Sequence, residues 1–133
     1  IRSPLWRHGG VVFGPHPRDF SYNIPKKVKL LALKSSLCVK LKENNLLVLD
    51  AFGIEKPKTK EAARVFSNLK ISPLKNLLLL LDKIDDDLKL ALRNIGYLDV
   101  NLAKDTHACE VLAHQKLIIT KGALNGLTDR LKQ

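Results

Sequence analysis

Residues 77–82 read Leu-Leu-Leu-Leu-Leu-Asp, and this short run decides the fold. Five successive apolar side chains, without the apolar–polar alternation of a half-exposed strand, indicate a strand that is buried on both faces. Strands of this kind belong to parallel sheets that helices cover on both sides. Three further apolar runs predict three more strands, at residues 46–51, 98–103 and 117–120.

The segments around these runs carry the signals of helices. We expect helices at residues 25–42, 59–69, 85–94, 107–113 and 122–131. Pro25 suits the first turn of a helix, and Thr59 is a suitable N-cap. Asp85-Asp86-Asp87 would place acidic side chains where the helix dipole favours them. In the first helix we expect lysines around one apolar stripe, which comprises Val28, Leu31, Ala32, Ser35, Cys38, Val39 and Leu41.

Strands that alternate with helices predict an α/β fold. We expect a three-layer, doubly wound, mostly parallel sheet of the Rossmann-like kind. This globular domain should span residues 23–133, and residues 1–22 should form an extended N-terminal arm. Three of the seven glycines and three of the six prolines lie in the arm, where they interrupt any helical or strand period. A chain of 133 residues that is 45% apolar can bury the core of one domain.

The positive charge is concentrated in the first third of the chain. The net charge is +10, and residues 1–42 contain nine basic side chains and one acidic side chain. Residues 43–133 contain 14 basic and 12 acidic side chains. A local positive field suits phosphate contacts, because each neutralised phosphate releases counterions. The partner should therefore be polyanionic, either nucleic acid or an acidic membrane surface. The longest apolar run is far too short to span a bilayer. Of the two partners we expect nucleic acid and no membrane.

The aromatic and arginine side chains of the arm fit contacts to RNA. Four of the seven aromatic residues lie there: Trp6, Phe13, Phe20 and Tyr22. Exposed rings can stack on bases, and guanidinium groups can fork onto phosphates or stack on bases. Gly9-Gly10 would let the backbone approach RNA closely. The alternative is that Trp6 and Phe13 fold back onto the domain as a small satellite core.

A second reading of the function rests on polar residues at the ends of the predicted strands. Asp50 and Asp82 follow two strands, at the place where α/β active sites occur, and Lys121 follows the last strand. This set would suit a small phosphoacceptor, receiver-like signalling domain or enzyme. However, no pair of acidic residues at the first strand is visible to hold Mg²⁺, and no GxGxxG or phosphate-binding loop follows a strand. We therefore expect turn or cap residues, no enzyme and no small-molecule substrate.

The remaining reactive residues predict neither a metal site nor catalysis. His107, Cys109, Glu110 and His114 lie near one another in the sequence, but their spacing fits no standard zinc signature, so we expect no cofactor. Cys38 has apolar neighbours and should be a buried thiol. Two distant cysteines fit a reducing compartment better than a secreted protein.

The arm also contains a highly specific motif. Residues 1–15 read Ile-Arg-Ser-Pro-Leu-Trp-Arg-His-Gly-Gly-Val-Val-Phe-Gly-Pro, and residues 17–22 read Pro-Arg-Asp-Phe-Ser-Tyr. This stretch resembles the C-terminal limb of the long loop in the large-subunit ribosomal protein four family, of bacterial or organellar type. Similar segments follow at residues 26–28, 31–33, 57–61 and 117–121. His8 stands where the family usually has glycine.

The resemblance implies a structural protein of the large ribosomal subunit, without catalysis. It would bind large-subunit ribosomal RNA, support assembly and, with a neighbouring ribosomal protein, narrow the nascent-peptide exit tunnel. By position in the motif, the residues implied to contact RNA are Arg2, Ser3, Trp6, Arg7, Gly9, Gly10, Phe13, Gly14, Pro15 and Arg18. To these we add His8, Lys26 and Lys27 as expected RNA-binding residues.

The expected partners are large-subunit ribosomal RNA and neighbouring ribosomal proteins. The expected location is the ribosome, in a bacterial cytoplasm, a plastid stroma or a mitochondrial matrix. The chain begins at Ile1 and contains no methionine, so we expect a further segment before it in the gene product. Members of the family carry an N-terminal segment and the ascending limb of the loop before this motif.

Overall fold

A computed structural model describes residues 2–54, 57–69 and 76–132. Helices and strands alternate along the chain: α1 Lys26–Lys42, β1 Leu46–Leu49, α2 Thr59–Asn68, β2 Leu77–Leu81, α3 Asp86–Leu92, β3 Leu98–Leu102, α4 Ala108–Ala113, β4 Lys116–Thr120 and α5 Lys121–Lys132. Each predicted element is present with the predicted type and order. The N-cap of α2 differs from the prediction: Lys58 occupies it and Thr59 is the first helical residue, with no side-chain cap.

The four strands form one parallel sheet in the order β1-β4-β2-β3. In its centre, Leu79 of β2 lies between Ile118 of β4 and Val100 of β3. The chain crosses from β1 over to β2, continues outward to β3, and returns to insert β4 between the first two strands. The sheet is therefore the predicted doubly wound α/β arrangement.

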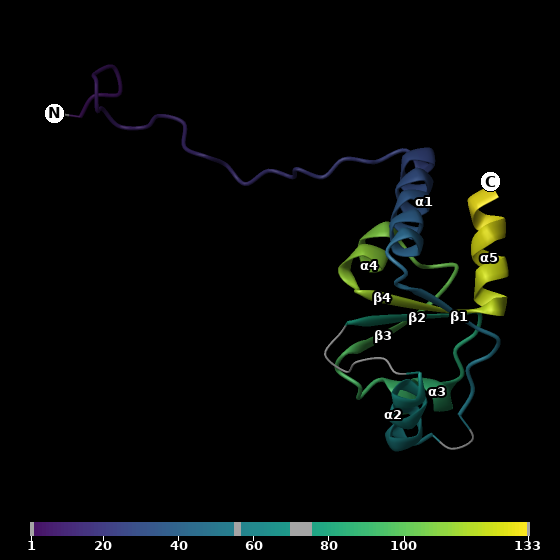
Figure 1. The fold of residues 1–133 in the computed structure, drawn as a ribbon. Helices are drawn as coiled ribbons and strands as arrows, with labels where there is room; N and C mark the ends of the chain where they lie inside the picture. Colours follow the sequence, from purple (N-terminus) through teal and green to yellow (C-terminus); the bar gives the residue numbers. More distant parts are fainter. Residues whose placement is uncertain (1, 55–56, 70–75, 133) are drawn as a thin grey trace.

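The leucines of β2 build cores on both faces of the sheet. All five are at most 3% exposed. Leu77, Leu79 and Leu81 pack on the side that α2 and α3 cover, whereas Leu78 and Leu80 pack on the side of α1, α4 and α5 (Figure 1). Each fully buried leucine contributes about 2 kcal/mol of hydrophobic stabilisation, which explains why no polar residue interrupts this strand.

The prediction for the buried side of α1 was wrong. Every residue of the expected stripe is exposed, and the exposed side chains include Leu31 (64%) and Leu41 (64%) as well as Cys38. The buried residues of α1 are instead Leu33, Ser36 and Lys40. Their spacing of three and four residues also describes one face of a helix. Because α1 carries apolar residues on both sides, periodicity alone could not identify the side that faces the sheet.

The prediction that strand 46–51 is buried was also wrong. The strand ends at Leu49, and Leu47 and Val48 are 37% and 48% exposed. The physical reason is that, in the sheet of the described residues, β1 lies at an edge and pairs with β4 alone. An apolar run reports the preference of a strand for burial, but it does not report the position of the strand within the sheet.

The N-terminal arm extends away from the start of α1, with the N-terminus at its far end (Figure 1). Almost all of its described residues are exposed. The arm is therefore displayed outside the domain.

None of the described helices is both long enough and apolar enough to cross a membrane.

Candidate nucleic-acid interface

The far end of the arm is a small closed loop. The Trp6 amide donates to the Ser3 carbonyl oxygen at 3.0 Å, and the Gly9 amide donates to the Trp6 carbonyl oxygen at 2.9 Å. The Gly10 amide donates to the Arg2 carbonyl oxygen at 3.0 Å and closes the loop. We call residues 2–10 the head loop. These bonds satisfy backbone groups locally, so the head loop can present its side chains outward.

The backbone of the head loop depends on small residues. His8 has φ 61°, in the left-handed region where a side chain is unfavourable and glycine is favoured. A Cβ atom at Gly9 would lie 1.9 Å from the Ser3 carbonyl oxygen and 2.9 Å from that of Trp6. The backbone at His8, where the sequence analysis expected glycine from the resemblance, therefore adopts a conformation that favours glycine.

The aromatic side chains of the arm are exposed. Trp6 is 65% exposed and Phe13 is 86% exposed. The alternative of a satellite core, in which these two rings fold back onto the domain, is therefore wrong. Phe20 (76%) and Tyr22 (81%) also lie in solvent. Exposed aromatic side chains along an extended segment form a platform on which unpaired bases can stack.

Arg18 and its neighbours form a second local structure in the arm. The Arg18 guanidinium lies 4.4 Å from the centre of the Phe20 ring, within the range of a cation–π contact. The Asp19 carboxylate accepts hydrogen bonds from the Ser21 amide and from the Ser21 hydroxyl, each at 2.8 Å. The backbone bond first, and the hydroxyl bond second, hold the pKa of Asp19 below its ordinary value.

The basic residues that the sequence singled out are exposed but not gathered in one place. Within the described ranges, no carboxylate pairs with Arg2, Arg7, Lys26 or Lys27. Arg2 and Arg7 lie in the head loop, whereas both lysines lie in the first turn of α1 at the other end of the arm (Figure 1). An extended ligand such as a nucleic-acid strand can contact both ends, because phosphates repeat along its length.

The residues of the alternative enzyme site do share one edge of the sheet. Lys121 Nζ lies 3.8 Å from Asp50 Oδ1, and a Cβ at Gly122 would lie 3.5 Å from the Asp82 Cβ. Both members of the ion pair are exposed, at 71% and 97%, so the pair contributes little. In the described part of the chain, no group of three metal-ligating side chains is positioned to hold an ion. Among the described residues, Asp50 and Asp82 are thus not joined by a third ligand of the kind that holds Mg²⁺ in phosphoacceptor chemistry.

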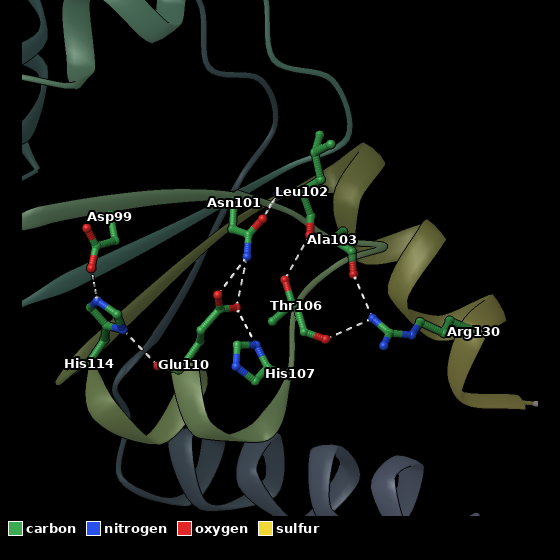
Figure 2. A network of polar contacts seen from close by, with 9 residues as sticks. All are labelled: Asp99, Asn101, Leu102, Ala103, Thr106, His107, Glu110, His114 and Arg130. Carbon is green, nitrogen blue, oxygen red and sulfur yellow. Dashed lines mark hydrogen bonds and ion pairs between the residues drawn. The ribbon is translucent and has the colours of Figure 1, made fainter. Parts of the chain in front are cut away.

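The cluster around α4 is a network of structural contacts (Figure 2). The side-chain amide of Asn101 donates to both carboxylate oxygens of Glu110, each at 2.9 Å. His107 Nδ1 lies 3.0 Å from Oε2 of the same carboxylate. His114 bridges Asp99 and the Glu110 carbonyl oxygen, each at 2.7 Å. These contacts fasten α4 to β3, and Cys109 takes no part in them.

Sequence analysis did not single out two basic residues, Lys29 and Arg130, that the fold brings to the start of the arm. Lys29 of α1 and Arg130 of α5 line one cavity together with Lys26. Arg130 belongs to the last helix, and no local pattern connects it with the arm. Only a correct tertiary arrangement of α1 and α5 could have revealed this cluster.

Comparison with known proteins assigns the sequence to a family. Residues 1–130 match the family model described as "Ribosomal protein L4/L1 family". The chain is 48% identical over 124 residues to a protein of Carboxydothermus hydrogenoformans named "Large ribosomal subunit protein uL4", a match that covers 93% of this chain and 59% of that protein. It is 42% identical over 131 residues to the protein of the same name in Staphylococcus carnosus, covering 98% of this chain and 62% of that protein. The chain thus spans about three fifths of the length of these relatives.

Proposed function

The chain belongs to the ribosomal protein L4/L1 family, and from this premise we propose that it is a structural constituent of the large ribosomal subunit that binds large-subunit ribosomal RNA. The observation that carries the proposal is the arm: exposed aromatic and basic side chains lie outside the domain on an extended segment without regular secondary structure. Residues 1–22 act as the RNA-binding arm, and residues 23–133 act as the domain that carries it.

The proposed contacts follow from the chemistry of the arm. Arg2 and Arg7 neutralise phosphates and release counterions, and Trp6 and Phe13 stack on bases, each stacked base contributing about 1–3 kcal/mol. Gly9 and the rest of the head loop bring backbone close to the RNA. The remaining members of the proposed contact set are Ser3, His8, Gly10, Gly14, Pro15, Arg18, Lys26 and Lys27.

The role that fits these contacts is architectural, in a ribosome of bacterial type. The arm becomes fixed when RNA surrounds it, and the domain then rests on the surface of the subunit beside neighbouring ribosomal proteins. Relatives named as large-subunit proteins of bacteria support this assignment. Support of subunit assembly and of the exit-tunnel region follows as the cellular role, and no catalytic step is assigned to the protein.

The test is binding to purified large-subunit ribosomal RNA across a salt series. We expect tight binding whose affinity falls steeply with salt, because several phosphates are neutralised. Arg7→Ala should reduce both the affinity and the salt slope, and Trp6→Ala should reduce the affinity at every salt concentration. Lys60→Gln, on the exposed surface of α2 across the sheet from α1, is the matched control and should change little. If deletion of residues 1–22 leaves the RNA affinity unchanged, the proposal is wrong.

A further inference from the structure

His114 lies at the point where three elements of the domain meet. It ends α4, and its imidazole contacts Asp99 of β3 (Figure 2). Its carbonyl oxygen accepts the hydrogen bond from Lys40 of α1 at 2.6 Å. The His114 side chain is only 11% exposed. The fold, rather than bulk water, must therefore satisfy the two ring nitrogens.

Both ring nitrogens of His114 face atoms that accept hydrogen bonds. Nδ1 lies 2.7 Å from the Glu110 carbonyl oxygen, and Nε2 lies 2.7 Å from Asp99 Oδ2. A carbonyl oxygen and an ionised carboxylate can only accept. A neutral imidazole has one N–H donor and one acceptor nitrogen, so it can make one of these bonds but not both. The two short contacts together therefore require one more proton than a neutral ring and an ionised carboxylate carry.

This additional proton makes the contacts of His114 depend on pH. When the proton passes to water, one ring nitrogen is left with a lone pair that points at an oxygen atom, and the two atoms repel each other. Imidazole is the side chain that gains and loses a proton near neutral pH. One of the two contacts should therefore open within the ordinary range of pH.

Asp99 is the partner that can move away. Its side chain is 76% exposed, so water can solvate the carboxylate once the contact with His114 opens. The contact of Nδ1 with the Glu110 carbonyl oxygen lies within the last turn of α4, and a neutral ring with its hydrogen on Nδ1 keeps it. The Asn101 side chain holds the Glu110 carboxylate one turn earlier. Opening is therefore confined to the end of α4.

The other titratable side chains near His114 do not contact Nε2. They come from each element that meets there: Asp99 of β3, His107 and Glu110 of α4, Lys40 of α1 and Lys116 of β4. The carboxylate of Glu110 is held by two other side chains, and Lys40 bonds to the His114 carbonyl oxygen rather than to the ring. In the described part of the chain, Asp99 alone contacts Nε2, so this contact follows the proton on that nitrogen.

We propose that Asp99 and His114 form a protonation-dependent clasp, which ties the end of α4 to β3 while the ring carries its second proton and opens when that proton is lost. The clasp is a property of the domain and does not depend on RNA binding. Because the His114 carbonyl oxygen also holds Lys40, the clasp stabilises the end of α4 to which α1 is attached. A rising pH loosens this junction and leaves the apolar cores on both faces of the sheet intact.

Two NMR measurements on the full chain test the clasp. The nitrogen signals of the His114 ring, recorded from about pH 5 to about pH 9, distinguish a ring with hydrogen on both nitrogens from a neutral ring. The His114 amide donates to the Glu110 carbonyl oxygen at 3.3 Å, so its protection from hydrogen exchange, corrected for the intrinsic effect of pH, reports whether the end of α4 is closed. We expect this protection to fall about fivefold over the pH interval in which Nε2 loses its hydrogen.

Three variants separate the clasp from simple packing. Asp99→Asn keeps the shape of the side chain but can donate to a neutral Nε2, so the protection should persist as the pH rises. His114→Gln removes the titrating ring and should make the protection independent of pH. His107→Gln is the matched control, because it removes the other histidine beside Glu110 and should preserve the step.

Each outcome decides the question. A step in protection that coincides with loss of the ring proton, disappears in Asp99→Asn and remains in His107→Gln supports the clasp. A ring that keeps one protonation state across the range overturns it, as does protection that stays constant while the ring loses its proton. An unchanged step in Asp99→Asn also overturns it, because the step would then not need the carboxylate. If His114→Gln does not fold, Asp99→Asn and the control still decide.

Discussion

Lys40 of α1 donates a hydrogen bond of 2.6 Å to the carbonyl oxygen of His114, the residue that ends α4. The lysine is only 6% exposed, and its partner lies 74 residues farther along the chain. The bond satisfies a carbonyl group that the end of α4 leaves without a helical partner. It therefore joins the side of α1 that also buries Leu33 and Ser36 to the end of α4.

Replacing this lysine should destabilise the domain. Lys40→Met keeps most of the aliphatic stem and removes the charged donor, so we expect a loss of about 1–3 kcal/mol in the free energy of unfolding. Urea denaturation of the full chain measures it, and Lys34→Met, at an exposed position of the same helix, is the control. Equal midpoints for the two variants would show that the bond contributes nothing.

Gly9 and Gly96 should respond differently to the same substitution. Gly9→Ala places a methyl group against the Ser3 carbonyl oxygen, so the head loop must open. Gly96→Ala, outside the arm, meets no atom within 4 Å and leaves the domain unchanged. We expect RNA affinity to fall about tenfold or more for the first variant and to stay constant for the second. A comparable loss in both would mean that the shape of the head loop is irrelevant to binding.

His8 offers a substitution that should improve the head loop. Because its φ is 61°, His8→Gly removes a conformational cost of about 1 kcal/mol. The Gly10 amide, which closes the loop on Arg2, should then exchange with solvent more slowly. Faster exchange in the variant would show that the imidazole stabilises the turn.

The sequence predicted much of the fold because its signals are local. Five leucines in succession identify β2 without any partner, and Pro25 marks the start of α1. The buried side of α1 could not be predicted, because both sides of the helix carry leucines: Leu33 is buried and Leu31 is exposed. The bond from Lys40 to the His114 carbonyl oxygen, which marks the buried side, joins residues far apart in the sequence. The arm was likewise visible from its composition, whereas Arg130 reaches the cavity only through tertiary packing.

Asp19 makes the arm sensitive to acid. Its pKa lies below the ordinary value of 3.8, first because the carboxylate accepts the Ser21 amide and second because it accepts the Ser21 hydroxyl. We call the structure formed by the two bonds between Asp19 and Ser21 the Asp19 turn. Since the pKa of Asp19 is lower in this turn than in the unfolded arm, ionisation of Asp19 stabilises the turn. That stabilisation is complete well above pH 3.8 and is lost as the pH falls through the lowered pKa.

Two substitutions of Ser21 separate the causes of this shift. Ser21→Ala removes the hydroxyl bond and should raise the pKa of Asp19 part of the way toward its ordinary value. Ser21→Pro removes both donors and should raise it fully, because proline has no amide hydrogen. NMR titration of the Asp19 carboxyl carbon measures this pKa in the unmodified chain and in both variants. A carboxyl that titrates at its ordinary value in the unmodified chain would show that these two hydrogen bonds do not form in solution.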